Sequence, residues 1–352
     1  MSIFTTILRQ FPPHTAHRIA LGVLKTGFMP KARIDHQVLK SKIWGLDFRN
    51  PVGLSAGFDK DAEAIGGLFS LGFGFVETGT VTPLPQSGNP RPNLFRLKED
   101  KALINWLGFP SRGLVLFSRK LETALADPEG IVGANVGINT ANPDAVGDIA
   151  LCAEKLAPLA DYLVINVSCP NTPGLMEWQT PDGISRILAA TRSAVKRAGG
   201  NPPVLVKLSP DIEGGKVEAV VKASVESGVA GFIISNTTLT RPPTLLSDNK
   251  NEQGGLSGPP IATLATDLLK RIFKMTKGQV PLIASGGISS AEDAYERIRS
   301  GASLVQIYTA LIYQGPGLVA EIAHGLAGLL KKDGFSSITE AVGVDHDFFK
   351  RG

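Results

Sequence analysis

Short runs of apolar residues recur along most of this chain and alternate with longer stretches that are apolar on one helical face. From residue 52 onward there are eight such runs, each five or six residues long and each followed by polar, small or glycine residues. A near-continuous apolar run is typical of a strand that is buried on both faces of a parallel sheet. We therefore predict parallel strands at residues 52–56, 73–78, 131–136, 162–167, 203–208, 231–236, 281–286 and 303–308.

Helical periodicity fills the gaps between these runs, most clearly at residues 111–127, 182–198, 214–228 and 289–301. Strands that alternate with helices form right-handed βα units. Eight such units predict an α/β protein with a (β/α)8 TIM barrel rather than an open doubly wound sheet. No Gly-x-Gly-x-x-Gly motif follows the first run, which argues against a dinucleotide-binding fold. Residues 42–51 predict a small hairpin that closes the barrel floor.

The first 42 residues have a different rhythm. Apolar residues between Ile3 and Phe11 fall on one helical face, those between Ile19 and Leu24 fall on another, and a Pro-Pro step separates them. This pattern predicts a short N-terminal helical extension. Amphipathic helices with basic flanks suit a protein that lies on an anionic membrane surface. A helical cap packed on its own domain explains the same pattern, and the residues alone do not decide between the two.

Charge sharpens this division of the chain. The 352 residues are 43% hydrophobic and 19% charged, which is ample for a sizeable core. Residues 1–42 hold seven Lys or Arg against one acid, Asp35, whereas the remaining 310 residues hold 29 basic and 31 acidic side chains. The basic excess therefore belongs to the N-terminal segment, and we expect no nucleic-acid partner. No apolar stretch reaches 18 residues, so we expect no membrane span.

Candidate chemistry gathers after the predicted strands, where TIM-barrel active sites lie. The fourth strand runs into INVSCPNTPGL, which places Asn166, Cys169 and Asn171 close together. A thiol in a modestly positive environment is a competent base or nucleophile near neutral pH. No histidine lies in the strand-end motifs, so we favour a base that acts without histidine; an inert buried cysteine is the alternative. Cys152, in a helical stretch, is expected to pack in the core, and no cysteine pattern predicts a disulfide or a metal site.

Lys207 lies inside the fifth apolar run, where an ammonium group is costly unless it meets an anion. It could pair with a structural carboxylate, form a Schiff base, or hold negative charge that develops on a cofactor ring. Lys60, after the first strand, could hold a substrate carboxylate or be solvated. After the seventh strand, Gly286 and Gly287 expose backbone N–H groups that suit a phosphate, or simply form a tight turn.

These motifs, in this order, resemble the dihydroorotate dehydrogenase family and specifically its membrane-associated class 2 branch. The resemblance extends from about residue 15 to about residue 325 and is too long and collinear to arise by chance. It rests on AHRIALGVLKTG, NPVGLSAGFDKD, GFGFVETGTVTPLPQSGNPRPNLFRL, INVSCPNTPGL, SNTTLTRP, GGLSG and GASLVQIYTALIY.

The resemblance implies an FMN enzyme that oxidises (S)-dihydroorotate to orotate in pyrimidine synthesis and passes the electrons to a quinone. Cys169 would be the catalytic base. FMN would be held by Ala56, Gly57, Phe58, Asp59, Lys60, Thr80, Asn135, Asn166, Lys207 and Ser235, with Gly258, Gly287, Tyr308 and Thr309 on the phosphate side. Orotate would contact Lys60, Asn105, Trp106, Leu107, Gly108, Phe109, Asn166, Asn171, Asn236 and Thr237.

The resemblance also implies a domain organisation and a cellular location. Residues 1–42 would form a membrane-binding segment with a quinone tunnel, and residues 43–352 the FMN-binding barrel. The protein would be peripheral, on the cytoplasmic side of the cell (inner) membrane. Alternatives are a soluble acceptor such as fumarate or NAD, a Schiff-base lyase that uses Lys207, and a non-catalytic ligand-binding relative.

Four residues depart from the class 2 pattern. Cys169 stands where class 2 members usually have serine, and we expect the thiol to abstract a proton at lower pH than a serine would. Trp106 and Pro110 stand where the family usually has arginine and asparagine, and Ile138 where class 2 usually has lysine. These departures affect the substrate loop and, less directly, the choice of electron acceptor.

Overall fold

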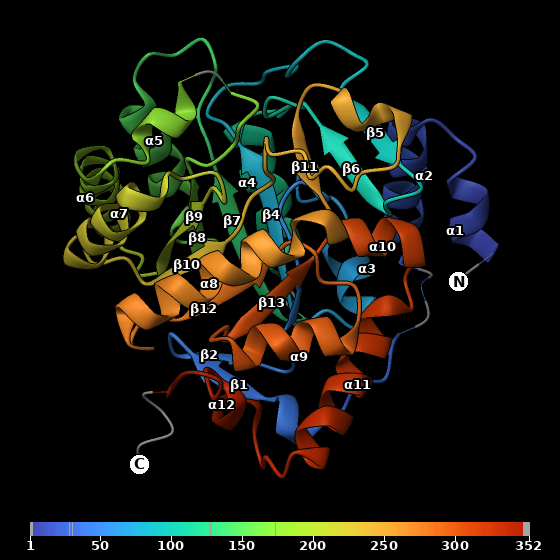
Figure 1. The fold of residues 1–352 in the computed structure, drawn as a ribbon. Helices are drawn as coiled ribbons and strands as arrows, with labels where there is room; N and C mark the ends of the chain where they lie inside the picture. The colour runs from blue at the N-terminus through green and yellow to red at the C-terminus, as the bar shows by residue number, and fades with distance from the viewer. Residues whose placement is uncertain (1–2, 28, 30, 127–128, 173, 348–352) are drawn as a thin grey trace.

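A closed barrel of eight parallel strands forms the body of the protein (Figure 1). The computed structural model describes residues 3–27, 29, 31–126, 129–172 and 174–347. All eight predicted strands are confirmed, in the order β3-β4-β7-β8-β9-β10-β12-β13 around the barrel. Their bounds are β3 Val52–Leu54, β4 Phe75–Val81, β7 Ile131–Val136, β8 Tyr162–Asn166, β9 Val204–Leu208, β10 Gly231–Ile234, β12 Leu282–Ser285 and β13 Leu304–Ile307.

Helices follow the strands and cover the outside of the barrel (Figure 1). The four predicted helical stretches are confirmed, and Cys152 is buried in the core as expected. In the longest helix, Pro181 occupies the first turn and Thr180 Oγ1 accepts the N–H of Gly183, which caps the helix. The helices are α3 Ile65–Ser70, α4 Leu114–Ala124, α5 Ala145–Leu156, α6 Pro181–Arg197, α7 Gly214–Glu226, α8 Ala262–Thr276, α9 Ala291–Arg299, α10 Thr309–Gln314, α11 Leu318–Lys332 and α12 Ile338–Ala341.

The predicted hairpin is confirmed as β1 Ser41–Ile43 and β2 Leu46–Phe48. Trp44, in its turn, donates its indole N–H to the carbonyl of Ala230 at 2.8 Å. Phe48 packs edge-on against Phe75, with 5.6 Å between ring centroids. These contacts close the barrel at the end where the strands begin, so the opposite end is left for chemistry.

A three-stranded antiparallel sheet beside the barrel was not predicted from the sequence. It consists of β5 Leu94–Leu97, β6 Ala102–Asn105 and β11 Gly255–Ser257, in the order β11-β6-β5. Figure 1 shows it next to the N-terminal helices. The strands are only three or four residues long, and Arg96 interrupts the apolar pattern of the first of them, so no strand pattern is recognisable there.

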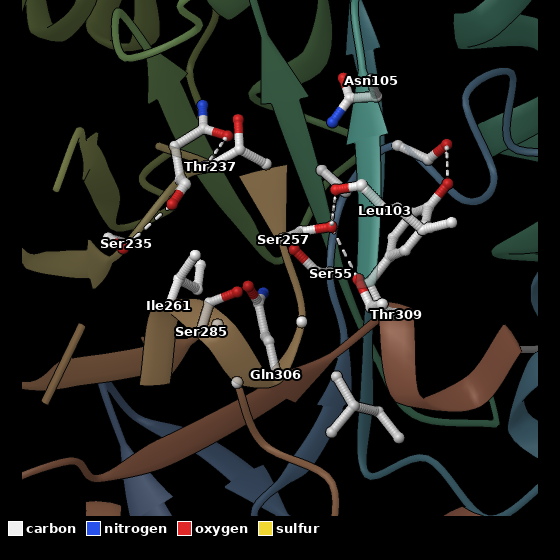
Figure 2. Close-up of a pocket in the computed structure, with 18 of the residues that line it drawn as sticks. Ser55, Leu103, Asn105, Ser235, Thr237, Ser257, Ile261, Ser285, Gln306 and Thr309 are labelled. Atoms are coloured by element: carbon white, nitrogen blue, oxygen red, sulfur yellow. Dashed lines mark hydrogen bonds between the residues drawn. The ribbon is translucent and has the colours of Figure 1, made fainter. Parts of the chain in front are cut away.

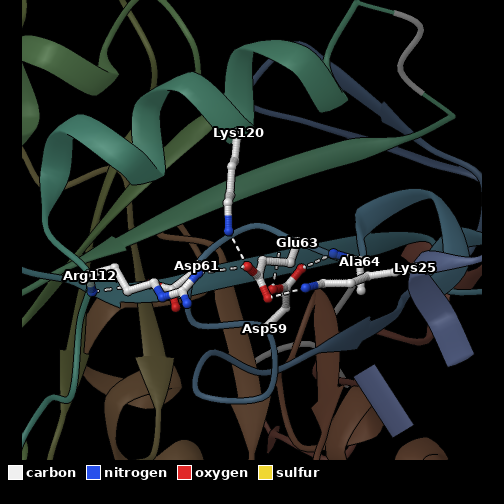
Figure 3. Close-up of polar contacts among 7 residues, drawn as sticks. All are labelled: Lys25, Asp59, Asp61, Glu63, Ala64, Arg112 and Lys120. Atoms are coloured by element: carbon white, nitrogen blue, oxygen red, sulfur yellow. Dashed lines mark hydrogen bonds and ion pairs between the residues drawn. The ribbon is translucent and has the colours of Figure 1, made fainter. Parts of the chain in front are cut away.

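The N-terminal extension forms two helices, α1 Ile3–Leu8 and α2 Pro13–Lys25, as predicted. A Cβ on Gly67 of α3 would lie 2.1 Å from the carbonyl oxygen of Leu24, so glycine allows the end of α2 to pack directly on α3. Beside this contact, Lys25 pairs with Glu63 at 2.5 Å, and Glu63 also contacts Lys120 and Arg112 (Figure 3). Among the described residues, none of the helices is both long and apolar enough to cross a bilayer.

Candidate active site

A cavity of about 1070 Å³ opens where the barrel strands end (Figure 2). Its lining comes from strand ends and from the loops that follow them, so residues far apart in the sequence meet there. It brings together most of the residues that the sequence predicted for the site. These are Ala56, Gly57, Thr80, Asn105, Leu107, Phe109, Asn166, Cys169, Asn171, Lys207, Ser235, Asn236, Thr237, Gly258, Gly287, Tyr308 and Thr309.

Three predicted residues of the loop after β3 do not line this cavity. The Asp59 carboxylate is buried and accepts the backbone N–H groups of Glu63 and Ala64, both at 2.8 Å, so it shapes the loop; burial raises its pKa. Lys60 Nζ donates to the carbonyl oxygen of Gly57 at 2.5 Å, and burial lowers its pKa to about 8. Phe58 packs edge-on against His17 with 5.1 Å between ring centroids, on the side of the N-terminal helices.

Three other predicted residues also lie outside the lining. Trp106 and Gly108 belong to the loop after β6, where the Trp106 N–H donates to the Asn93 carbonyl at 2.8 Å. A Cβ on Gly108 would lie 2.7 Å from the Asn89 carboxamide. Asn135 is fully buried behind the cavity wall, where it acts on other residues of the site.

Asn135 is the second member of a hydrogen-bonded chain that begins at Glu77. The Glu77 carboxylate accepts the Asn135 amide at 2.7 Å and the Gln306 amide at 2.6 Å. Because a carboxylate only accepts, it turns Oδ1 of Asn135 the other way, toward the Thr80 hydroxyl at 2.6 Å and the Asn166 amide at 3.2 Å.

The chain continues from Asn166 into the cavity. Asn166 Oδ1 accepts the Asn236 amide at 3.3 Å and the Ser168 hydroxyl at 3.1 Å. Asn236 Oδ1 in turn accepts the backbone N–H of Thr237 at 2.8 Å. The buried carboxylate of Glu77 therefore fixes which side of each amide donates at the ends of β7, β8 and β10.

Cys169 is 8% exposed, at the wall of the cavity. Burial raises its pKa to about 11, although the Asn171 backbone N–H, the Thr172 hydroxyl and the charge of Lys207 all favour the thiolate. In this structure burial therefore favours the neutral thiol, and the role of Cys169 as the base stays a prediction. The positive neighbour exists, but desolvation outweighs it.

Lys207 is buried and donates to the Ser55 hydroxyl at 3.2 Å. Burial lowers its pKa, while Glu77 and Cys169 favour its charged form. No carboxylate of the described residues forms an ion pair with it, so the structural salt bridge considered above is not observed. Its ammonium group faces the cavity with capacity to stabilise negative charge on a bound ligand.

The lining of the cavity differs between two regions: glycine, serine and threonine residues that suit an anionic group, and amides with the Lys207 ammonium that suit a polar ring. In the first region, Gly258 and Gly287 have φ of +102° and +73°, and a Cβ on Gly287 would lie 2.6 Å from the Cα of Ala262. The Ser257 and Thr309 hydroxyls lie 2.8 Å apart in the same region (Figure 2). Deeper in, the buried acceptor Gln306 Oε1 has no partner among the described residues.

Sequence reasoning missed several residues of the lining. Ser55 and Gln306 lie inside or at the end of apolar runs, and a polar residue in such a run signals an inward position that could have identified them. Leu94 and Leu103 belong to the unpredicted sheet and carried no comparable signal. Gly286 lines the cavity as expected; the missed residues are Ser55, Leu94, Leu103, Ser257, Pro259, Ile261, Ser285, Ile288, Ser289, Gln306, Ile307 and Ala310.

A second cavity, of about 900 Å³, lies beneath α1 and α2. Its walls are mainly apolar, with Arg9, His17 and Arg96 as the basic residues of the lining. Burial lowers the pKa of His17 to about 3, and the charge of Lys60 contributes to the same effect, so its imidazole is neutral. Three residues line both cavities and form a shared wall: Leu94, Leu103 and Tyr308.

Known proteins match this chain over almost its whole length. A family model described as dihydroorotate dehydrogenase matches residues 38–330. The dihydroorotate dehydrogenase (quinone) of Azorhizobium caulinodans is 49% identical over 341 residues, which cover 95% of this chain and 96% of that protein. The mitochondrial dihydroorotate dehydrogenase (quinone) of Mus musculus is 44% identical, over 98% of this chain and 89% of that protein.

A solved structure agrees with these matches. The crystal structure of DHODH from Eimeria tenella in complex with ferulenol superimposes with a TM-score of 0.92 at 39% identity, and the match covers 96% of this chain and 97% of that one. Sequence and structure thus agree over both the barrel and the N-terminal helices. The chain therefore belongs to the dihydroorotate dehydrogenase family, in its class 2 branch.

Proposed function

We propose that this protein is a quinone-dependent dihydroorotate dehydrogenase, which oxidises (S)-dihydroorotate to orotate in pyrimidine synthesis. Members of its family work with a flavin, and we assign FMN as that flavin here. The observation that carries the proposal is the convergence of Cys169, Lys207 and the amides of Asn166, Asn171 and Asn236 in one cavity. Turn residues alone would suffice for a structural strand end, so this concentration of reactive groups needs a chemical explanation.

The lining fits FMN at both ends. Gly258, Gly287 and Thr309 would hold the phosphate, since backbone N–H groups and a hydroxyl can approach it without a side chain in the way. Thr80, Asn166 and Lys207 would hold the ring. A flavin held there would supply the hydride acceptor, and the Lys207 ammonium would be placed to balance negative charge on its ring.

Proton removal and the binding of the substrate would be carried out by side chains of the protein. Cys169 would take the proton from the ring carbon next to the one that loses the hydride. Asn171 donates its amide to Asn105 Oδ1 at 3.0 Å, and its own Oδ1 is buried without a partner among the described residues, so it can accept a substrate N–H. Lys60 does not line the cavity as the structure stands, but Gly57, whose carbonyl it contacts, does, and we propose that its ammonium group turns from that carbonyl to hold the substrate carboxylate. The amides replace water around the substrate and fix its orientation.

The second cavity would be the quinone tunnel. It lies against the first, and its mainly apolar walls suit an apolar quinone ring. On the outside of the N-terminal helices, Ile7 is 54% exposed, Phe11 41% and Ile19 36%, so apolar side chains face outward next to basic ones. We therefore assign residues 1–42 as a segment that rests on an anionic membrane surface, on the cytoplasmic side of the cell membrane, and residues 43–352 as the catalytic barrel.

The test is an anaerobic experiment on the purified flavoprotein. Dihydroorotate should bleach the yellow flavin, and a quinone should then restore the colour. Restoration by fumarate or NAD but not by quinone would assign a soluble acceptor instead. Colour that dihydroorotate does not bleach would indicate a non-catalytic relative, and trapping of substrate on Lys207 by borohydride would indicate a Schiff-base lyase.

A further inference from the structure

One buried cation near the cavity has no part in the chemistry described so far. Arg297, in α9, is 2% exposed. Its Nη2 donates to two backbone carbonyl oxygens, those of Ala262 at 2.9 Å and of Gly286 at 3.2 Å. Its Nε and Nη1 are buried and have no hydrogen-bond partner among the described residues.

Carboxylates do not neutralise this guanidinium directly. Asp267, Asp293 and Glu296 favour its charged form from a distance, but none of them pairs with it. Arg299, two residues further along the same helix, shows the contrast, because it pairs with Asp345 at 2.6 Å and with Asp333 at 3.1 Å. A buried cation that meets only neutral acceptors is costly, so a compensating anion is expected close by.

The geometry of one peptide bond indicates where that anion would be. In a planar trans peptide the C=O and the next N–H point to opposite sides. Because Arg297 holds the Gly286 carbonyl, the N–H of Gly287 faces away from Arg297, and both glycines line the first cavity. Arg297 thus lies directly behind the turn that exposes this N–H.

The other hydrogen-bond partner of Arg297, the Ala262 carbonyl, also lies beside the Gly286–Gly287 turn. Ala262 begins α8, and a Cβ on Gly287 would lie 2.6 Å from its Cα, so the guanidinium joins the turn to the start of α8. The residues that line this end of the cavity are mainly glycine, serine and threonine, and none of the described ones is cationic.

We infer that Arg297 is a positioning residue and the buried counter-charge for a phosphate group bound at the Gly258, Gly287 and Thr309 end of the cavity. It acts through the Gly286–Gly287 peptide rather than by touching the ligand. The inference rests on the proposed function, which places the FMN phosphate at this end. It predicts that Arg297 discriminates FMN from riboflavin, which has the same ring but no phosphate.

The full-length chain, freed of flavin, is titrated with FMN and separately with riboflavin. Arg297→Gln keeps N–H donors for the two carbonyls but removes the charge, so FMN binding should weaken by about 10-fold or more while riboflavin binding changes by less than about 3-fold. Arg297→Lys keeps the charge and should recover most of the preference for FMN. Arg299→Gln, on the exposed face of α9, is the control and should change neither affinity.

Equal weakening of FMN and riboflavin in Arg297→Gln would overturn the inference, because a purely structural role predicts that result. If Arg297→Gln does not fold, Arg297→Met takes its place, and failure of both to fold would assign the guanidinium to the fold and also overturn the inference. Equal binding of the two ligands by the wild-type chain would remove the phosphate site of the proposed function, and this inference with it.

Discussion

The two cavities touch through one wall, yet they are built in opposite ways. The first lies at the mouth of the barrel and is lined by amides, hydroxyls and the Lys207 ammonium from the strand ends. The second lies between the N-terminal helices and the barrel and is lined mainly by aliphatic side chains. Figure 1 shows that α1 and α2 lie to one side of the barrel rather than over its mouth.

The difference between the two linings matches two kinds of chemistry, proton removal and electron transfer. Proton removal needs groups that can change or balance charge, and we propose that Cys169 and Lys207, which line the first cavity, do this. Transfer of electrons to an apolar acceptor needs a site that an apolar ring prefers to water, and we propose that the second cavity is that site. Each substrate should therefore respond to changes in its own cavity, and four experiments test this separation.

The largest effect is expected from Cys169→Ala in the first cavity. Loss of the base should slow flavin reduction by dihydroorotate by about 100-fold to 10,000-fold, measured anaerobically by stopped flow. Cys152→Ala is the matched control, because this thiol is buried in α5 away from the cavity and should affect stability but not the rate. Reduction at the wild-type rate in Cys169→Ala would show that another group is the base.

The second experiment fills the second cavity. Ala20, on α2, lines it, and Ala20→Phe should lower quinone turnover by about 10-fold by occupying space that the quinone needs. Flavin reduction by dihydroorotate should stay unchanged. Ile19→Phe, at the exposed neighbouring position, should change neither rate. Deletion of residues 1–27, which removes α1 and α2 and leaves the β1–β2 hairpin intact, should abolish quinone turnover and spare flavin reduction; equal loss of both would argue against a separate tunnel.

The third experiment removes the charge beneath the first cavity. In Glu77→Gln, one of the two donors, Asn135 or Gln306, faces an N–H group instead of an oxygen. The free energy of unfolding should fall by about 1.5–3 kcal/mol, measured in urea, and flavin should dissociate faster. Glu218→Gln removes an exposed carboxylate that pairs with Arg271 and should leave both unchanged. If Glu77→Gln is as stable as the wild type and retains flavin normally, the hydrogen-bonded amides that start at Glu77 do not need its charge.

The smallest expected effect is a change with pH in kcat/KM for dihydroorotate, without a matching change for the quinone. Burial lowers the pKa of Lys60 to about 8, and a lysine is charged below its pKa. If its charge holds the substrate carboxylate, kcat/KM for dihydroorotate should decrease above pH 8, with about a twofold loss at pH 8 itself. Lys60→Gln should lower kcat/KM and remove this decrease. A decrease that persists in the variant would assign the titration to another group.

The barrel could be predicted from the sequence because each of its strands is buried on both faces and is therefore apolar along its length. Where burial is partial, prediction failed, as for β5 with Arg96 in its middle. The amides and the thiol of the site could be predicted because they follow strands directly. Their environment could not: the raised pKa of Cys169 and the pairing of Glu77 with Gln306 depend on neighbours that are far away in the sequence.

The second cavity could not be predicted from the sequence pattern either. The pattern predicted two amphipathic helices, but the space beneath them exists only because α2 packs on α3 and β5, between residues that are distant along the chain. The family resemblance supplied the expectation of a tunnel. The packing shows an apolar cavity beneath the two helices, and its use as a quinone tunnel stays a prediction.

The wall of Leu94, Leu103 and Tyr308 has a kinetic consequence. Leu94 and Leu103 come from the small sheet beside the barrel. This sheet would therefore keep dihydroorotate and the quinone in separate cavities. Because the two reactants would occupy separate sites, we expect the parallel double-reciprocal plots of a two-site ping-pong scheme, in which orotate competes with dihydroorotate but not with the quinone.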